Sequence, residues 1–253
     1  MKAFTPILLC FTGLLLTATA FSAAQQESAE IWYRQAAERA DSLGSGKAKT
    51  RNVILFIGDG MSLTTVAAAR IFDGQQHGRT GEENQLSFEQ FPATAFSKTY
   101  NTNSQTPDSA GTMTAMITGA KTRMGFLSVS QVPERGQCQQ SLNNPLTSAM
   151  TLAKAAGLAT GVVTTTRITH ATPAATYAHS PERNWESDAE MPETAKAQGC
   201  RDIALQLVDY SSSTGVDVVM GGGLNKFLPS GSNPKYPDAK GARKDGKDLV
   251  KQW

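Results

Sequence analysis

Apolar and polar positions fall into blocks along the chain, and three of these blocks predict strands. Asn52–Ile57 contains a continuous apolar run, Val-Ile-Leu-Phe-Ile, which ends at Gly58-Asp59-Gly60. Two shorter apolar runs lie at Thr160–Thr165 and Val216–Met220. Uninterrupted runs of this kind are typical of strands in a sheet that is covered on both faces.

Blocks with helical spacing lie between these runs. Residues 28–43 predict an amphipathic helix, and 147–157 and Cys200–Tyr210 predict two more. Strands that alternate with helices indicate an α/β fold, with a largely parallel sheet flanked by helices. The stretch Ser230–Lys247, rich in Gly, Pro, Lys and Asp, predicts a long surface loop.

The C-terminal residues predict the start of a further helix. Asp245-Gly-Lys-Asp248 resembles an N-terminal capping arrangement, and Leu249, Val250 and Trp253 begin an apolar stripe. The chain stops about two turns into this helix, and a helix so short is marginal by itself. We therefore expect the sequence to be the N-terminal part of a longer protein, with a fold incomplete at its C-terminal side and a sheet edge left uncovered.

The N-terminal residues predict a secretory signal peptide. Met1-Lys2 supplies a positive charge, Ile7–Leu16 is apolar, and small residues follow at Ala18–Ala24. A buried element of the fold is the alternative, and the run is too short for a stable membrane span. We expect residues 1–24 to be removed and 25–253 to be exported, to the periplasm or the medium.

Composition narrows the functional classes. An apolar fraction of 40% with 18% charged residues is ordinary for a globular protein and argues against disorder. Lys and Arg total 24 against 22 for Asp and Glu, and the basic residues are scattered, so a nucleic-acid partner is not expected. Beyond the leader the cysteines are Cys138 and Cys200. In an exported chain such a pair predicts one disulfide, with two buried thiols as the alternative.

The first candidate for chemistry is Asp59, which directly follows the first predicted strand. Ligands in open parallel sheets bind beyond the carboxyl ends of the strands. The neighbours Gly58 and Gly60 allow a sharp turn and the close approach of a ligand. Asp59 is therefore a candidate metal ligand, and an ordinary Asp-Gly turn is the alternative.

The second candidate is Ser109, in the sequence Thr106-Pro107-Asp108-Ser109-Ala110-Gly111-Thr112. An apolar segment, Met113–Ile117, follows and predicts a buried helix, so Ser109 lies at or near its N-terminus. Free N–H groups and the helix dipole favour an anion there. Ser109 is a candidate nucleophile activated by a metal ion; the alternative is that Asp108 or Ser109 simply caps the helix.

The third candidate group follows the second predicted strand. His170 and Thr172 point the same way if this segment is extended. The oxygens of Asp59 and Thr172 suit Mg²⁺. Arg183 can bind two phosphate oxygens with its planar guanidinium. A surface histidine and a solvated arginine are the alternatives.

Taken together, these motifs strongly resemble the alkaline phosphatase family. The resemblance rests on Val53–Asp59-Gly60-Met61, Pro107–Ala110, Val162–Ala174 and Arg183-Asn184-Trp185, in that order, and extends to Val218–Gly223. His170 stands where the animal-type branch has histidine and the enteric bacterial enzyme has aspartate. The chain is therefore closer to the animal-type branch, although its leader looks bacterial.

The resemblance implies a role for each candidate residue. Ser109 would be the nucleophile that becomes phosphoserine and also contacts a metal. Asp59 would bridge one zinc and the magnesium, and Thr172 would be a magnesium ligand. His170 would lie beside the magnesium through its water shell, and Arg183 would bind the phosphoryl oxygens.

The resemblance also implies cofactors and partners. The full enzyme would hold two Zn²⁺ and one Mg²⁺, hydrolyse small phosphate monoesters and form a homodimer. Cys138 and Cys200 match a disulfide of the animal-type branch. The other zinc ligands of the family lie in its C-terminal half, and His77 and His179 match none of them. Lys235 precedes Tyr236-Pro237-Asp238 where the animal-type calcium site has an acidic residue, so that site is not predicted.

Three functions remain open at this level. The first is a metal-dependent phosphomonoesterase whose nucleophile half is this chain. The second is a phosphodiesterase or sulfatase of the same superfamily, although the sulfatase signature is absent around Ser109. The third is an exported, truncated product without catalysis, and for the isolated chain we expect little or no turnover.

Overall fold

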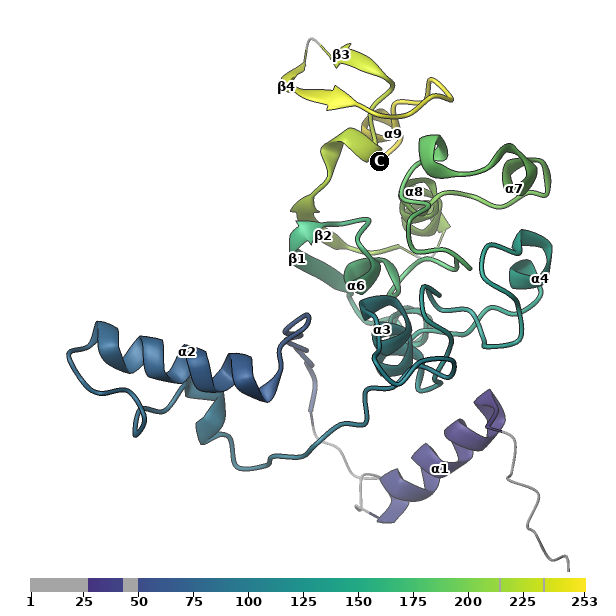
Figure 1. Ribbon diagram of the computed structural model, residues 1–253. Helices are drawn as coiled ribbons and strands as arrows, with labels where there is room; N and C mark the ends of the chain where they lie inside the picture. The colour runs from purple at the N-terminus through teal and green to yellow at the C-terminus, as the bar shows by residue number, and fades with distance from the viewer. Residues whose placement is uncertain (1–26, 43–49, 214, 234) are drawn as a thin grey trace, which may run out of the picture.

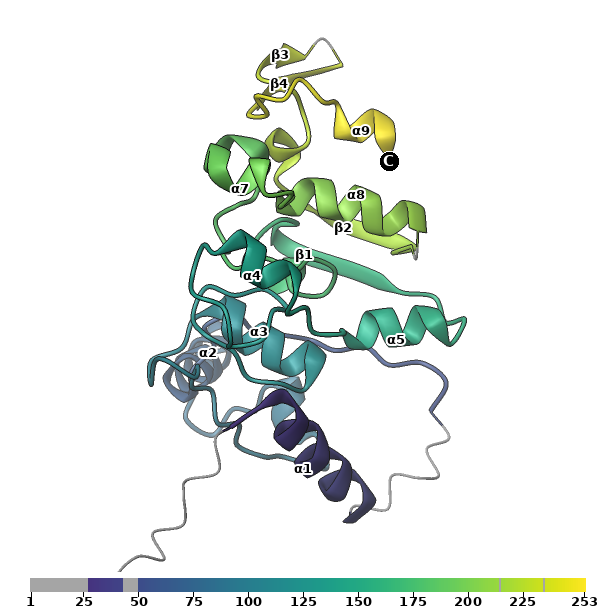
Figure 2. The ribbon, with the colours of Figure 1, turned by 90° about the vertical axis from the view of Figure 1, so that its right-hand side faces the viewer.

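The computed structural model describes residues 27–42, 50–213, 215–233 and 235–253, so the predicted leader at 1–24 lies outside the described residues. Figures 1 and 2 show a body that holds the strands and most helices. Beside the body lie α1 (Ala29–Ser42) and an arm that carries α2 (Leu63–Gln76). The other elements are η2 (Ser87–Gln90), α3 (Ser109–Thr118), α4 (Cys138–Leu142), α5 (Ala149–Ala155), β1 (Gly161–Arg167), α6 (Ala171–Ala174), η3 (Asp188–Glu190), α7 (Glu193–Ala197), α8 (Ile203–Ser213), β2 (Val218–Gly222), η4 (Leu224–Lys226), β3 (Gly231–Asn233), β4 (Tyr236–Gly241) and α9 (Leu249–Gln252).

The sheet of the body is formed by β1 and β2. The two strands pair in parallel, with Gly161 opposite Val218 and Val163 opposite Met220. Helix α8 lies in the connection between them, as a parallel pair requires. The second and third predicted strands, the helices at 147–157 and Cys200–Tyr210, and the α/β class are therefore confirmed.

The main hydrophobic core lies on one face of this sheet. Val162 of β1 is buried there with Ile203 and Leu207 of α8 and Met113 of α3. On the opposite face, Val163 keeps 71% of its surface exposed. The prediction of a sheet covered on both faces is therefore wrong for the described residues, because helices cover one face alone.

The first predicted strand is also wrong. Asn52–Ile57 has no assigned strand structure, and Val53 and Phe56 are 86% and 90% exposed. Ile57 is the residue of this run that packs against the main core. A strand needs a partner for its backbone N–H and C=O groups, and within the described part of the chain no strand is paired with this run.

Of the helices α1 and α2 outside the body, α1 was predicted from the sequence and α2 was not. Helix α1 confirms the prediction at 28–43, but none of its described residues is buried, so its apolar stripe faces no core there. Hydrogen bonds from Tyr100 Oη and Gln131 Nε2 to Glu27 hold the segment just before α1. Helix α2 was not predicted, because its apolar residues do not form one clear stripe; Ser62 caps it by accepting from Thr65 N.

The segment expected to be a loop at Ser230–Lys247 is partly ordered as an antiparallel pair, β3 with β4. The single-loop prediction is wrong there because turn-forming residues also occur in short hairpins. The same segment carries Arg243, a fully buried cation that pairs with Asp202 and Asp245. After it, Asp248 accepts from Lys251 N and begins α9, which confirms the predicted capped helix.

Cys138 and Cys200 form the predicted disulfide, with their Cα atoms 5.8 Å apart. The bond joins α4 to the segment just before α8. Cys138 is buried in a second, smaller core with Trp185, Met191 and Ala195. The disulfide therefore supports the stretch that contains Trp185, two residues beyond Arg183.

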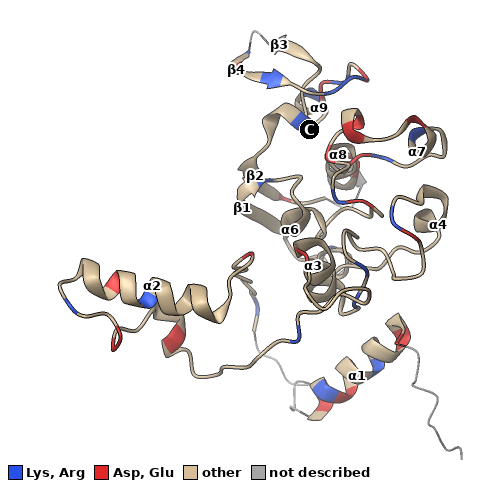
Figure 3. Cartoon of the chain, viewed as in Figure 1, with Lys and Arg blue, Asp and Glu red and all other residues tan. Residues whose placement is uncertain are grey.

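Charge is mixed over the surface. Figure 3 shows Lys and Arg interspersed with Asp and Glu over the body, the arm and α1. This pattern agrees with the small net charge of +2. Across the described residues, each helix is too short or too polar to traverse a bilayer.

Candidate active site

Ser109 is the first residue of α3, as the sequence predicted. Asp108 caps the helix: its Oδ1 accepts from Gly111 N at 3.0 Å. The capping role therefore belongs to Asp108, and the hydroxyl of Ser109 is available for another partner. It donates to Asp59 Oδ1 at 2.9 Å.

Asp59 connects two other candidates. It lies in a turn where Met61 N donates to Gly58 O, and Gly60 has a positive φ of 65° that favours glycine. While Ser109 donates to Asp59 Oδ1, Thr172 Oγ1 donates to Asp59 Oδ2 at 2.7 Å. The structure thus brings these three residues together from three distant parts of the chain.

The carboxyl of Asp59 is stabilised in its ionised form. Burial opposes ionisation, but the hydrogen bonds from Thr172 and Ser109, with the nearby His170 and Arg183, outweigh it and lower the pKa of Asp59. An ionised carboxylate supplies the hard oxygen ligands that divalent cations such as Mg²⁺ take. The contacts of Asp59 thus reach beyond its own turn, to Ser109 and Thr172.

His170 lies at the N-terminus of α6, between Asp59 and Arg183. Its Nδ1 is 3.8 Å from Asp59 Oδ2 and is buried without a hydrogen-bond partner in the described structure. Its Nε2 accepts from Arg183 Nη2 at 3.2 Å. Burial and the charge of Arg183 lower the pKa of His170. Because Arg183 Nη2 can only donate, Nε2 is the acceptor of that contact, and in the neutral imidazole the proton lies on Nδ1, toward Asp59.

Arg183 is held at two points. Its Nη2 donates to His170, and its Nη1 donates to Asp108 Oδ2 at 3.1 Å. Asp108 also accepts from Gly125 N and from Asn101 Nδ2, at 3.0 and 2.9 Å. Asp108 thus joins the N-terminus of α3 to the guanidinium of Arg183.

Sequence reasoning missed this second role of Asp108, and it missed Asn101 altogether. Asp108 directly precedes Ser109, and that adjacency was the available signal. Asn101 is 2% exposed and lies in an isolated bridge with Ser104. Its sequence context contains no motif that points to the site.

The other two histidines have partners elsewhere. His77 ends α2 in the arm, where its Nδ1 contacts Asp73 O at 2.7 Å. His179 Nδ1 contacts Ser128 O, also at 2.7 Å. Within the described residues, no group of three or more His, Cys, Asp or Glu side chains comes together in a way that could hold a metal ion.

Comparisons with a family model and with curated proteins point to the same family. Residues 50–253 match the family model described as Alkaline phosphatase. The tissue-nonspecific alkaline phosphatase of Mus musculus is 45% identical over 259 residues, covering 98% of this chain and 48% of that protein. The chain therefore spans about half the length of the curated relatives it matches.

Solved structures show the same likeness. The alkaline phosphatase of Thermus thermophilus superposes with a TM-score of 0.56 at 31% identity, over 79% of this chain and 34% of that one. A variant of the enzyme from the Antarctic bacterium TAB5, solved with magnesium bound in its M3 site, has a TM-score of 0.55 at 27% identity, over 79% of this chain and 44% of that one. The resemblance to this family and the α/β fold class expected from the sequence are confirmed.

Proposed function

The chain belongs to the alkaline phosphatase family, and on that premise we propose that it carries the nucleophile half of a metal-dependent phosphomonoesterase site. The observation that supports this most directly is the hydrogen bond from Ser109 Oγ to Asp59 Oδ1. It joins a serine at a helix N-terminus to a carboxylate that also binds the hydroxyl of Thr172. A helix capped by Asp108 alone would not require either contact.

In the proposed reaction, Ser109 Oγ loses its proton and forms a bond to phosphorus as the P–O bond to the leaving group breaks, which gives a phosphoserine; the leaving alkoxide takes up a proton and departs as the alcohol. Water then attacks phosphorus as the bond from phosphorus to Oγ breaks, a proton of the water returns to Oγ, and inorganic phosphate is released. The hydrogen bond to Asp59 directs the serine proton toward Oδ1 and leaves the lone pairs of Oγ facing away from that carboxylate. The N–H groups at the start of α3 favour the charge on the bound phosphoryl group.

Arg183 would bind the phosphoryl oxygens. A guanidinium has five N–H donors in one plane. Two of them are used on Asp108 and His170, so the others can contact a phosphoryl group held near Ser109. Because both protein contacts fix the plane of the guanidinium, little side-chain freedom is lost when the anion binds.

The described residues fit magnesium in part. Asp59 and Thr172 offer oxygen ligands, and Mg²⁺ commonly keeps several waters beside one or two carboxylates. The buried, unpartnered Nδ1 of His170 lies 3.8 Å from Asp59 Oδ2 and could donate to such a water. Bound there, the ion would supply positive charge that stabilises Asp59 and neighbouring phosphoryl oxygens.

The described residues do not fit zinc by themselves. Zinc sites normally take three or four protein ligands, and the described part of the chain lacks any such cluster of His, Cys, Asp and Glu. Two zinc ions would require ligands beyond these residues. This observation favours a second candidate for the isolated chain, an exported product with little or no turnover.

The remaining family properties belong to the same proposal. The substrates would be small phosphate monoesters, as in the alkaline phosphatase family, because the candidate residues Ser109 and Arg183 would contact the phosphoryl group. Export through the predicted leader at 1–24 agrees with the disulfide, which forms in oxidising compartments. A homodimer and a broad leaving-group tolerance follow from family membership alone.

A single assay tests the proposal. The protein is expressed from its complete gene, its intact mass is measured, and hydrolysis of p-nitrophenyl phosphate is followed with and without a chelator. We expect chelator-sensitive turnover that Ser109→Ala abolishes and that Ser42→Ala, a change at the exposed end of α1, leaves unchanged. Turnover that survives Ser109→Ala would overturn the proposed nucleophile.

The same experiment separates the candidate functions. A mass well above 26.9 kDa with metal-dependent turnover supports the phosphatase. The mass of this chain less its leader, without turnover at full metal loading, supports the inactive product. Faster hydrolysis of a diester or a sulfate ester than of the monoester would support the related superfamily enzymes.

A further inference from the structure

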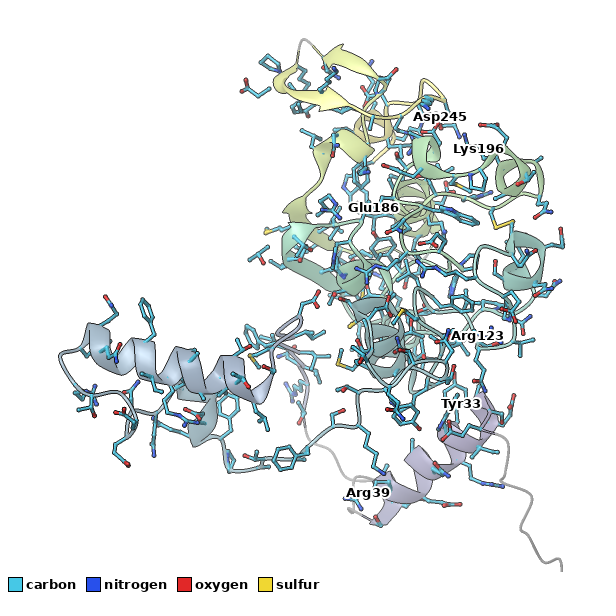
Figure 4. The ribbon with its side chains drawn as sticks, in the orientation of Figure 1. Tyr33, Arg39, Arg123, Glu186, Lys196 and Asp245 are labelled. Carbon is cyan, nitrogen blue, oxygen red and sulfur yellow. A yellow bond between two sulfur atoms is a disulfide. The ribbon has the colours of Figure 1, made fainter. Side chains whose placement is uncertain are left out.

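We propose that Glu186 is a positioning residue, which holds the segment carrying Arg183 in register with the segment carrying His170 and Thr172. The inference rests on the proposed phosphatase function, because it concerns the geometry of that site. Glu186 is 9% exposed, and Figure 4 shows it in the body of the protein, away from the arm. It lies three residues beyond Arg183.

The carboxylate of Glu186 binds the end of β1 through three hydrogen bonds. Arg167 Nε and Nη2 donate to its two oxygens at 2.8 and 2.7 Å, in a two-point contact. Thr169 Oγ1, on a fully buried residue, donates to Oε2 at 2.6 Å. All three donors come from the two residues that lie one and three positions before His170.

The backbone around Glu186 is held from the other side by α8. Ile203 N donates to Trp185 O at 2.9 Å, and Ala204 N donates to Glu186 O at 3.1 Å. Trp185 is buried against the disulfide-linked Cys138. The segment is therefore fixed to α8 by its backbone and to β1 by the side chain of Glu186.

This arrangement has a consequence for the site. The contact between Arg183 Nη2 and His170 Nε2 joins the same two segments a short distance away. Loss of the hydrogen bonds from Arg167 and Thr169 to Glu186 would let the segment with Arg183 shift relative to the segment with His170. Displacements of about 1 Å produced by remote residues can slow an enzyme by roughly 100-fold, so a partial loss of register predicts a measurable defect.

Glu190 provides a matched comparison four residues further along. It too is a glutamate in an ion pair, with Lys226, and it accepts from Ser187 N at 2.8 Å, although it is exposed where Glu186 is buried. Neither partner belongs to the segment at the end of β1 that Glu186 contacts. Removing the charge of Glu190 therefore costs an ion pair in the same stretch of chain, and it leaves the contact of Glu186 with Arg167 and Thr169 in place.

The experiment is a double-mutant cycle in the protein expressed from its complete gene. The variants are Glu186→Gln, Arg183→Ala and the two combined, with Glu190→Gln as control. We measure kcat/KM for p-nitrophenyl phosphate and the inhibition constant of inorganic phosphate. As a readout independent of turnover, we measure the rise in Tm that inorganic phosphate produces.

We expect Glu186→Gln to lower kcat/KM about 10-fold, to weaken phosphate inhibition by a similar factor and to reduce the phosphate-induced rise in Tm. In the Arg183→Ala background the same substitution should change kcat/KM less than about 2-fold, because residues that act through one another are not additive. Glu190→Gln should leave kcat/KM and phosphate binding at the parental values.

A second variant covers the case in which Glu186→Gln does not fold. The side chain of Arg167 is half exposed, so Arg167→Lys disturbs the buried residues less. It removes the two-point contact with Glu186 and keeps the positive charge. It should give a smaller defect of the same kind, again absent when Arg183 is already alanine. Equal effects in both backgrounds, or equal effects of Glu186→Gln and Glu190→Gln, would overturn the positioning role.

The proposed function can fail separately. If Ser109→Ala leaves turnover unchanged, the assigned reaction is wrong whatever the cycle shows. If Ser109→Ala abolishes turnover while Glu186→Gln and Arg183→Ala are additive, the reaction stands and the role of Glu186 is wrong.

Discussion

Ser109 and Asp59 lie 50 residues apart in the sequence and share a hydrogen bond of 2.9 Å. The serine is placed by the start of α3, and the aspartate is placed by the Gly58–Gly60 turn. The two residues therefore lie in separate structural elements, each with its own local geometry. The contact is thus a property of the tertiary fold, and it turns two weak local motifs into one candidate site.

The first prediction concerns Asp59→Asn. The amide keeps the size of the side chain, but it is neutral and one of its two terminal groups can no longer accept the hydroxyl of Ser109 or Thr172. We expect turnover of the complete protein to fall at least about 100-fold, a loss typical when a group that organises a charged site is removed. Steady-state kinetics with p-nitrophenyl phosphate measures it.

Magnesium provides an independent readout for this variant. We expect added Mg²⁺ to raise the Tm of the parent and to leave that of Asp59→Asn unchanged, because binding to the native state alone stabilises it. Asp238→Asn, which changes an exposed residue of β4, should respond like the parent. If Mg²⁺ raises the Tm of Asp59→Asn as much as it raises the Tm of the parent, Asp59 is not one of the magnesium ligands.

The second prediction concerns Asp108→Asn. Asp108 caps α3 and also pairs with Arg183, so its neutral analogue weakens a cap and an ion pair together. We expect the free energy of unfolding to fall by roughly 1–3 kcal/mol, measured by urea denaturation. Because Arg183 loses one of its two fixed points, inorganic phosphate should inhibit more weakly. Tighter phosphate inhibition would contradict this account of Asp108.

Local patterns predicted much of the fold because the forces behind them are local. Helix α3 follows from a capping residue before an apolar segment, and α9 follows from Asp248 in the same way. Strands β1 and β2 follow from apolar runs separated by the helical spacing of α8. The disulfide follows from a pair of cysteines in a chain with a predicted leader.

The failures are those in which the outcome depends on distant residues. The run at Val53–Ile57 has the composition of a strand, yet strand formation requires a neighbour that its own residues cannot specify. The double role of Asp108 depends on Arg183, 75 residues away. The network around Arg243 was missed because nothing in a Gly-, Lys- and Asp-rich stretch distinguishes a buried arginine from a solvated one.

The third prediction concerns His179 and pH. Burial lowers the pKa of His179 below its usual 6.5, and the hydrogen bond to Ser128 O opposes this only in part. The unfolded chain therefore binds a proton at a higher pH than the folded chain does. Stability should fall as pH decreases from about 6.5 toward the lower folded pKa.

A substitution isolates this contribution. His179→Gln cannot take up the proton, so its free energy of unfolding should change less than that of the parent between pH 7.5 and 5.5. Urea denaturation of the two proteins at the two pH values measures this change. An equal change in the free energy of unfolding of His179→Gln and of the parent would contradict the assignment.

The last prediction concerns the buried ion network that joins the C-terminal segment to α8. Arg243 Nη1 and Nη2 donate to the two oxygens of Asp202, both at 2.9 Å, and Arg243 also pairs with Asp245. Arg243→Met keeps most of the side-chain volume but leaves Asp202, which is 2% exposed, without its counter-ion. Because an uncompensated buried charge is costly, we expect a loss of about 3–5 kcal/mol in the free energy of unfolding.

A double variant distinguishes lost charge compensation from lost packing. Asp202→Asn in the Arg243→Met background removes the unpaired charge, so part of the stability should return although one more ionic partner has been deleted. Arg201→Gln breaks the exposed pair with Asp209 next to this network and should cost less than about 1 kcal/mol. If the double variant is less stable than Arg243→Met alone, the loss comes from packing around Arg243, and the network is not held together by compensation of the Asp202 charge.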